Sequence, residues 1–376
     1  MNILLSEKQE DLKKKCSEFV DKEVKPRIKE FEKNNFINKD FFKIMGDYGY
    51  LAGSVNQEYG GQAFNMIELG IIQEELGMGY MSVQNISTVS EMVSSVIYKF
   101  GTEEQKRRYL PGMTSGELIG AFALTEPLVG SSIKEIKTEA SYSEGSFIIN
   151  GKKKWITLAQ IADFFIVFAK YNEKPCAFLV DSNTAGIKIN PISNILGFRC
   201  NMLAEVEFNN CKISEEDLLG SVGFGLNLVA SLGLTRGRYT TAWGGIGLAQ
   251  AALDDAVVYS KNRMQFDRKI GDFQINKRSL SIMISELHAA RLLCYNSGIL
   301  YDNHKKKEFL NEVLVAKYFS SKIANDCAYR ALQLHGANGV LPEYNVERYF
   351  RDAKILECIE GVSELYEVLI VDNEVR

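Results

Sequence analysis

The spacing of apolar residues changes twice along the chain, and this change constrains the fold more than any other feature. Up to about residue 119 apolar side chains recur at helical spacing, between 120 and 222 they form short strand-like runs, and from about 223 the helical spacing returns. The chain is therefore predicted to be mainly α-helical with a middle β-domain. The first helical pattern is carried by Leu12, Cys16, Phe19 and Val20.

Short apolar runs carry the strand signal, and no helix-length pattern lies between them. They cover residues 146–150, 164–168, 177–181 and 203–208. Strands at this spacing predict a β-domain of the sandwich or barrel type. We therefore expect an N-terminal helical domain over residues 1–119, a middle β-domain over 120–222 and a C-terminal helical bundle over 223–376.

Charge and composition exclude several classes of protein. A net charge of -4 favours neither nucleic acid nor an anionic membrane surface as a partner, and no apolar run reaches the ~18 residues of a membrane span. The 7 cysteines are scattered without a CxxC pair and the 3 histidines lie far apart, so neither a disulfide framework nor a metal site is predicted. The N-terminal segment lacks the apolar core of a signal peptide, which indicates a cytoplasmic protein.

Hydroxyl and aromatic side chains gather at two predicted strand ends. ThrGluPro at 125–127 and TrpIleThr at 155–157 place two threonines and an indole where they can line the edge of a planar ring system. Ordinary turn chemistry explains the same residues, because Thr, Pro, Gly and Ser are common where strands end. Both interpretations stay open at this point.

A Gly-rich segment, GlnLeuHisGlyAlaAsnGly at 333–339, follows a long helical stretch. Its backbone N–H groups can bind a phosphate, but a glycine at this place also commonly ends a helix. No strand precedes the segment and its spacing is not GxGxxG, so a Rossmann site is not indicated.

Glu360 precedes Gly361 in an otherwise apolar neighbourhood. A carboxyl group in such surroundings has a raised pKa and can remove a proton from a weakly acidic C–H bond. The alternative is a glutamate that caps a helix terminus.

Taken together, these segments resemble the acyl-CoA dehydrogenase family, in the family's order and over essentially the whole chain. The resemblance implies N-terminal helices, a middle β-domain and a C-terminal four-helix bundle, assembled as a homotetramer or a dimer. It also implies FAD as the cofactor, an acyl thioester of CoA or of a carrier protein as the substrate, and an electron-transfer flavoprotein as the type of acceptor. The matching segments are residues 58–61, 101–111, 121–127, 150–157, 263–274, 333–339 and 351–361.

The resemblance assigns roles position by position. Glu360 matches the base that removes the substrate α-proton, while flavin N5 accepts the β-hydride. Ser131, Arg238 and Gly361 match positions that contact the substrate. The segments around residues 263 and 333 match those that reach FAD across a subunit boundary. The positions that match FAD contacts are Phe122, Leu124, Thr125, Trp155, Thr157, Arg263, Gln265, Phe266, Gln274, Gln333, Gly336, Ala337, Gly339 and Glu364.

Several departures from the family pattern put the substrate in doubt. Val362 lacks the hydroxyl group usual after GluGly, and Thr235 stands where an Asp or Asn often bonds the pantetheine of the substrate. Because most FAD contacts remain, FAD binding is expected to survive these changes. Other replacements fall in the ThrGluPro and TrpIleThr segments, at Leu128, Val129, Ser132 and Leu158.

Residues 82–91 align with the helix that lines the acyl chamber in the family, and they are rich in polar side chains. If these face inward, the chain resembles the branch that oxidises small hydroxy- or amino-acyl groups on a carrier protein. That branch makes hydroxymalonyl or aminomalonyl extender units for polyketide and nonribosomal peptide pathways, as in the colibactin type. The polar residues are Ser82, Gln84, Asn85, Ser87, Thr88, Ser90 and Glu91.

If the same residues form a solvated helix face, a short-chain fatty acyl-CoA dehydrogenase is the alternative. A flavin oxidase and a non-catalytic scaffold on the same fold are further alternatives. The presence together of Glu360, Arg263 and Trp155 argues against the scaffold.

Overall fold

The computed structural model describes residues 5–375, so the first four residues of the N-terminal segment considered above lie outside the description. The N-terminal region is helical, as predicted. Ser6, Asn65 and Thr102 each begin a helix with a capping box, in which the side chain three residues on returns the hydrogen bond. The helices are α1 (Glu7–Phe19), α2 (Ile28–Asn34), α3 (Lys39–Asp47), α4 (Met66–Gly79), α5 (Met81–Phe100) and α6 (Glu103–Ser115).

A seven-stranded sheet forms the middle region, which confirms the predicted β-domain. Its strand order is β1-β4-β2-β3-β7-β6, with β5 paired to β4. Alternate residues of β4 pack into different cores, Phe164 on one face and Phe165 on the other, because both faces of the sheet are covered. The strands are β1 (Gly120–Ala123), β2 (Glu139–Ser143), β3 (Ser146–Ile156), β4 (Phe164–Tyr171), β5 (Lys174–Asp181), β6 (Ile187–Pro191) and β7 (Ala204–Ser214).

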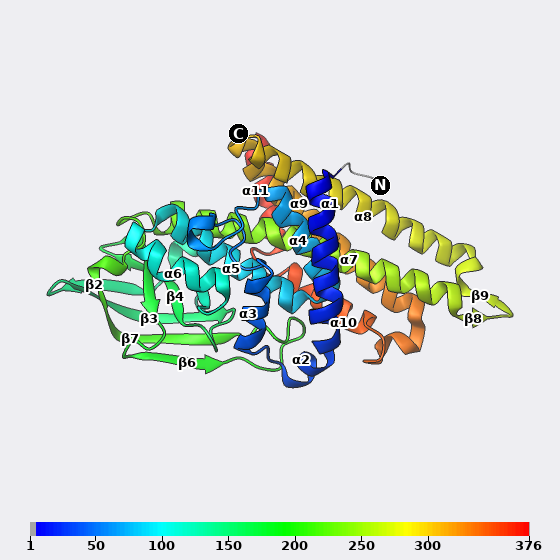
Figure 1. Ribbon diagram of the computed structural model, residues 1–376, viewed down its shortest axis with the longest axis horizontal. Coiled ribbons are helices and arrows are strands. Elements are labelled where there is room, and N and C mark those ends of the chain that lie inside the picture. The colour runs from blue at the N-terminus through cyan, green and yellow to red at the C-terminus, as the bar shows by residue number, and fades with distance from the viewer. Residues whose placement is uncertain (1–4, 376) are drawn as a thin grey trace.

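Long helices make up the C-terminal region, again as predicted. Figure 1 shows α7 and α8 running away from the sheet to a small hairpin, β8–β9, at the opposite end of the molecule. The elements are α7 (Ser231–Asn262), β8 (Met264–Gln265), β9 (Arg268–Lys269), α8 (Gln274–Asp302), α9 (Lys306–His335), α10 (Val346–Leu356) and α11 (Ser363–Val375).

Helices α4 and α5 pack on α7, so the two helical regions share one core. Glycines permit the close approach of these helices. A Cβ built on Gly70 would lie 2.2 Å from the Trp243 ring, and one built on Gly77 would lie 2.5 Å from the Gly244 carbonyl oxygen. A side chain at either glycine would therefore force α4 away from α7.

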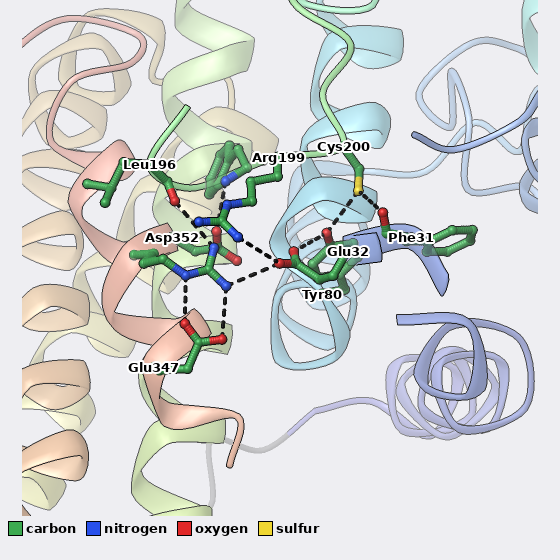
Figure 2. Close-up of polar contacts among 10 residues, drawn as sticks. Phe31, Glu32, Tyr80, Leu196, Arg199, Cys200, Glu347 and Asp352 are labelled. Carbon is green, nitrogen blue, oxygen red and sulfur yellow. Dashed lines mark hydrogen bonds and ion pairs between the residues drawn. The ribbon is translucent and has the colours of Figure 1, made fainter. Parts of the chain in front are cut away.

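A polar joint connects α2, the segment after β6 and α10 (Figure 2). Arg351 Nη2 lies 3.1 Å from Glu32 Oε2, and its Nε lies 2.7 Å from Glu347 Oε2. The Asp352 carboxyl group accepts a hydrogen bond from the Phe198 N–H at 2.7 Å. The joint fixes α10, the helix that leads into the segment around residue 360.

All seven cysteines are free, and six of them are buried. Within residues 5–375 no group of His, Cys, Asp or Glu side chains is arranged to hold a metal ion. No helix in the same range is long and apolar enough to cross a membrane.

Candidate active site

Glu360 lies in the turn between α10 and α11, in a backbone conformation that a glutamate rarely adopts. Its φ is 56° and that of Gly361 is 115°, so two successive residues have positive φ. Glu360 Oε2 is buried and has no hydrogen-bond partner among residues 5–375. This oxygen therefore caps no helix, which argues against the alternative interpretation of Glu360 as a capping residue.

Two helices enclose the Glu360 carboxyl group. A Cβ built on Gly237 of α7 would lie 2.4 Å from Glu360 Oε2 and 2.8 Å from Met92 Sδ of α5. Real Cβ atoms do not approach other heavy atoms this closely, so the carboxyl group occupies space that only glycine leaves open. The result is a buried carboxylate oxygen with no hydrogen-bond partner among residues 5–375.

The end of β1 lies along the same face of α7. A Cβ built on Gly233 would lie 2.7 Å from the Phe122 ring and 3.5 Å from Val96 of α5. Gly233 precedes Gly237 by about one helical turn, or about 6 Å along the axis. Phe122, one of the residues expected at the flavin ring, therefore packs on α7 about one turn before the position that Glu360 contacts.

Burial dominates the electrostatics of this site. It raises the pKa of Glu360 to about 7, against the attraction of Arg238 and Lys317 for the charged form. Burial also lowers the pKa of Lys317 to about 8, although Glu360 favours the ammonium form. At neutral pH the Glu360 carboxyl group is divided between its protonated and ionised forms, which suits a group that must take up and release a proton.

Other residues expected at the flavin ring lie at the ends of β1 and β3. Trp155 is 52% exposed and has a φ of 61°. Thr125 and Thr157 are half-buried, and Leu124 is buried behind them. An exposed indole beside two hydroxyl groups and an apolar backing has the donor set and shape that a flat heterocycle needs, so these residues fit a flavin ring.

A buried ion pair holds the two strand ends together. Lys153 Nζ lies 2.8 Å from Glu126 Oε1 and donates to the Leu124 carbonyl oxygen at 3.1 Å. Glu126 also accepts hydrogen bonds from the Thr138 N–H and hydroxyl group. Because its partners are buried with it, this pair fixes the backbone beside Thr125 and Trp155.

The remaining FAD positions lie elsewhere in the chain. Arg263, Gln265 and Phe266 are exposed on or next to the β8–β9 hairpin, and Gln274 is exposed at the start of α8. The structure does not bring this hairpin to the sheet (Figure 1). The positions at the end of α9 are the exposed Gln333, Gly336 and Ala337, and the buried Gly339.

The positions expected to contact the substrate divide into two groups. Arg238 Nε donates to the Glu360 carbonyl oxygen at 3.4 Å, and Gly361 is part of the same turn. Ser131 is exposed in the loop after β1, and Glu364 is exposed in the first turn of α11. No contact between Glu360 and either of these two residues is found within residues 5–375.

The polar residues of segment 82–91 are buried, so the interpretation as a solvated helix face is wrong. None of them is more than 9% exposed. Gln84 Nε2 lies 2.8 Å from Gln73 Oε1, 2.8 Å from Thr88 Oγ1 and 3.0 Å from the Thr240 carbonyl oxygen. Gln84, Thr88 and Met92 follow one another at helical spacing on the face of α5 that meets α7.

Three further polar residues of α5 form hydrogen bonds to the backbone of the segment that follows α3. Ser87 donates to the Tyr50 carbonyl oxygen at 2.7 Å, and Ser90 accepts from the Ala52 N–H at 3.0 Å. Glu91 accepts from the Ser54 N–H at 3.3 Å. These three side chains hold the segment after α3 and do not face Glu360.

Four residues next to Glu360 were not found from the sequence. Lys317 gave a weak signal, because a lysine on an apolar helix face needs a buried partner. Nothing in the sequence pattern marked Gly237, Met92 or Tyr366, which reach the site only through the packing of α5, α7 and α11.

Comparisons with known proteins cover the whole chain. The acyl-CoA dehydrogenase N-terminal domain matches residues 6–117, the middle domain 121–211 and the C-terminal domain 223–374. The mitochondrial short-chain specific acyl-CoA dehydrogenase of Homo sapiens is 35% identical over 381 residues, which cover 100% of this chain and 92% of that protein.

Solved structures that share the fold include an acyl-CoA dehydrogenase and a carrier-protein oxidase. An acyl-CoA dehydrogenase from Bacillus anthracis complexed with FAD has a TM-score of 0.95 at 28% identity, covering 99% of this chain and 68% of that one. The prolyl acyl carrier protein oxidase AnaB has a TM-score of 0.93 at 26% identity, covering 98% of this chain and 99% of that one. Both likenesses extend over the sheet and the two helical regions.

Proposed function

The chain belongs to the acyl-CoA dehydrogenase family of FAD-dependent oxidoreductases, and on that premise we propose that Glu360 is the base that removes the α-proton of an acyl thioester. The observation that carries this assignment is the buried, unpaired Oε2 of Glu360 between Gly237 and Met92. Because no hydrogen-bond donor among residues 5–375 occupies this oxygen, it is free to approach a substrate C–H bond and take its proton.

The pKa of about 7 supports the same role. A thioester α-proton is far too weakly acidic for an ordinary carboxylate, and a more basic carboxylate has a greater driving force for taking it. Arg238 and Lys317 favour the ionised form of Glu360 before it reacts. Protonation then neutralises the carboxyl group, which suits its apolar surroundings.

Residues of β1 and β3 are proposed to hold the flavin ring beside this base. FAD supplies the acceptor for the hydride that leaves the β-carbon. Trp155 offers a flat face, and Thr125 and Thr157 offer hydroxyl groups. Phe122 packs on Gly233, one turn of α7 before Gly237, which contacts Glu360. The substrate therefore belongs between the β1 end and the Glu360 turn.

The polar face of α5 favours a small polar acyl group as the substrate. Thr88 lies about 6 Å, and Gln84 about 12 Å, along the helix axis from Met92, the residue next to the base. Gln84 Nε2 donates to Gln73 Oε1, Thr88 Oγ1 and the Thr240 carbonyl oxygen, and these three bonds use neither Gln84 Oε1 nor the Thr88 hydroxyl hydrogen. A hydroxyl or amino group on the acyl chain can pair with these atoms, whereas an alkyl end would strand them.

A carrier protein is the proposed bearer of this acyl group, as in the extender-unit branch. The prolyl acyl carrier protein oxidase AnaB has the same fold over nearly its whole length. Thr235 donates to the Ser231 carbonyl oxygen at 2.7 Å, so only its lone pairs remain for a pantetheine amide. The proposal extends to an electron-transfer flavoprotein as the acceptor, to a homo-oligomer, and to the domain boundaries after residues 119 and 222.

A short-chain fatty acyl-CoA is the second candidate substrate. The 35% identity to the human short-chain enzyme and the apolar Met92 beside the base favour it. Anaerobic stopped-flow reduction of the flavin by butyryl-CoA and by seryl- and glyceryl-carrier-protein thioesters separates the two. Faster reduction by the polar thioesters supports our proposal, and fast reduction by butyryl-CoA alone would overturn the substrate while leaving Glu360 as the base.

A further inference from the structure

Two side chains, neither of them expected to bind the cofactor or the substrate, form hydrogen bonds to the turn that carries Glu360. Lys317 lies in the middle of α9 and is completely buried, and Tyr366 lies in the second turn of α11 and is 1% exposed. Neither was assigned a role in cofactor or substrate binding. Both side chains end at the backbone of Glu360 and Gly361.

The contacts fall on successive carbonyl groups of the turn. The Tyr366 hydroxyl donates to the Glu360 carbonyl oxygen at 2.7 Å, and Lys317 Nζ donates to the Gly361 carbonyl oxygen at 2.9 Å. Lys317 Nζ also lies 4.7 Å from the centre of the Tyr366 ring, within range of a cation–π interaction. The two residues thus contact each other and the turn together.

The turn needs such restraint because its backbone is unfavourable. A glutamate with positive φ persists only where the surrounding structure over-determines it. Without these two hydrogen bonds only the longer, 3.4 Å bond from Arg238 remains on the turn, so Glu360 can relax towards negative φ and its carboxyl group would leave the space beside Gly237. A shift of about 1 Å in a reacting group is enough to slow a reaction by roughly a hundredfold.

We infer that Lys317 and Tyr366 are positioning residues, which fix the Glu360–Gly361 backbone from α9 and α11 so that the base points at the substrate. This inference rests on the proposed role of Glu360. Tyr366 acts only through its hydroxyl group and its ring, whereas Lys317 also brings a charge. The two residues are therefore expected to leave different signatures.

The charged and titratable groups that face Glu360 define those signatures. They are Arg238 from α7, Lys317 from α9 and Tyr366 from α11, while α5 presents the uncharged Met92. Lys317 is itself influenced by Glu360, Arg238, Cys358 and Glu357. Loss of the Lys317 charge removes one influence that favours the ionised Glu360, so the pH at which the base becomes active should rise. Loss of the Tyr366 hydroxyl group should not move it.

The test uses the FAD-loaded protein with Tyr366→Phe, which keeps the ring, and Lys317→Gln, which keeps a donor without the charge. The substrate is whichever of butyryl-CoA and the seryl- and glyceryl-carrier-protein thioesters reduces the wild-type flavin fastest. The limiting rate of flavin reduction by this thioester is measured from pH 6 to 9. We expect each variant to be slower by roughly ten- to a hundredfold at saturating substrate. We also expect the pH midpoint to rise only in Lys317→Gln.

Hydrogen–deuterium exchange of the peptide covering residues 357–366 supplies a readout that needs no turnover. Exchange should be faster in both variants, because the turn is less restrained. Tyr318→Phe is the matched control, since its hydroxyl group also joins α9 to α11, through Glu367 at 2.8 Å, without touching the turn. Lys322→Met, an exposed lysine of α9, controls for loss of a charge on the same helix.

Wild-type rates and exchange in Tyr366→Phe and Lys317→Gln would overturn the inference. If Lys317→Gln does not fold, Tyr366→Phe decides alone, because it removes a single oxygen. Glu360→Gln, assayed alongside, separates failure of the positioning role of Lys317 and Tyr366 from failure of Glu360 as the proposed base. If Glu360→Gln is inactive while both other variants are unimpaired, only the positioning role fails; if Glu360→Gln is fully active, the proposed base itself is wrong.

Discussion

The carboxyl group of Glu360 lies so close to the α-carbon of Gly237 that a side chain at position 237 would displace Glu360 or Met92. The two residues come from different elements, the α10–α11 turn and the second turn of α7. Their fit means that α7 shapes the space in which the base stands, while Arg238 of the same helix donates to the Glu360 carbonyl oxygen.

Gly237→Ala should abolish most of the activity. The added methyl group would lie 2.4 Å from Oε2, so Glu360 must move or α7 must shift. We expect flavin reduction to fall by roughly a hundredfold or more. Gly245→Ala on the same helix is the matched control, because its new Cβ would meet its nearest neighbours at an ordinary 3.5 Å. Equal activity of the two variants would contradict the site geometry.

Glu360→Gln should keep the fold and the flavin but lose reduction by substrate. The amide has nearly the same shape as the carboxyl group and cannot accept the proton, so we expect a loss of roughly 10²–10⁴-fold. Anaerobic bleaching of the bound flavin measures it directly. A variant that still bleaches at the wild-type rate would point to another carboxylate, such as the exposed Glu364.

The pH dependence of the reaction should follow Glu360. Because burial raises its pKa to about 7, the base form is lost as the pH falls through this value, and kcat/KM should rise with pH and level off above it. A profile already flat at pH 5 would show that the base has an ordinary carboxyl pKa.

The same pKa shift makes a prediction for stability. A carboxyl group whose pKa is raised from 4.5 to about 7 holds its proton more tightly in the folded state, so its contribution to the free energy of unfolding falls as the pH rises across that window. Glu360→Gln lacks this dependence. Urea unfolding should therefore show the variant gaining stability relative to the wild type between pH 4.5 and 7, and parallel curves would contradict the shift.

Thr88→Val should change substrate preference without changing the chemistry. The two side chains have nearly the same shape, but valine removes the hydroxyl group from the chamber face of α5. We expect kcat/KM for the polar thioesters to fall by roughly tenfold while that for butyryl-CoA is maintained or improves. Ser94→Ala deletes a hydroxyl group that bonds only the Glu91 carbonyl oxygen of its own helix, and serves as the control. An equal effect on both substrates would place Thr88 outside the acyl chamber.

FAD retention should depend on assembly of the chain. Phe266 is 87% exposed on the hairpin that lies far from the sheet, so we expect Phe266→Ser to weaken FAD binding by roughly tenfold through a neighbouring subunit. Fluorescence of released flavin on dilution, followed beside sedimentation, measures this. Leu310→Ser, which also alters an exposed apolar residue, is the control. A monomer that retains all its FAD would refute the shared site.

The coarse fold could be predicted because periodicity is a local property. The spacing of Leu12, Cys16 and Phe19 predicted a helix directly, and the apolar run at 164–168 predicted the strand that is β4. The burial of Ser87 and Ser90 could not be predicted in this way. Their polarity is satisfied by the backbone of Tyr50 and Ala52, which are distant in sequence, so side-chain type alone gave two equal interpretations.

The candidate site was predicted in part, for a similar reason. Glu360 could be found because it stands beside a glycine in an apolar segment. Its positive φ, the close contact with Gly237 and the hydrogen bond from Tyr366 depend on how three helices pack, and no local pattern encodes that packing. The family resemblance predicted the roles of individual residues, whereas the contacts that hold Glu360 in place became known only from the structure.

The glycines of α7 have a consequence for the order in which the chain folds. Each costs a helix about 1 kcal/mol relative to alanine, and several in one helix leave it unable to persist in water alone. The helix therefore depends on packing for its stability, and α5 and α4 fill the space that Gly244 and Gly247 leave, through Gln84 and Glu74. Because α4 and α5 precede α7 in the chain, we expect α7 to become helical as it packs on them. The glycines are Gly233, Gly237, Gly244, Gly245 and Gly247.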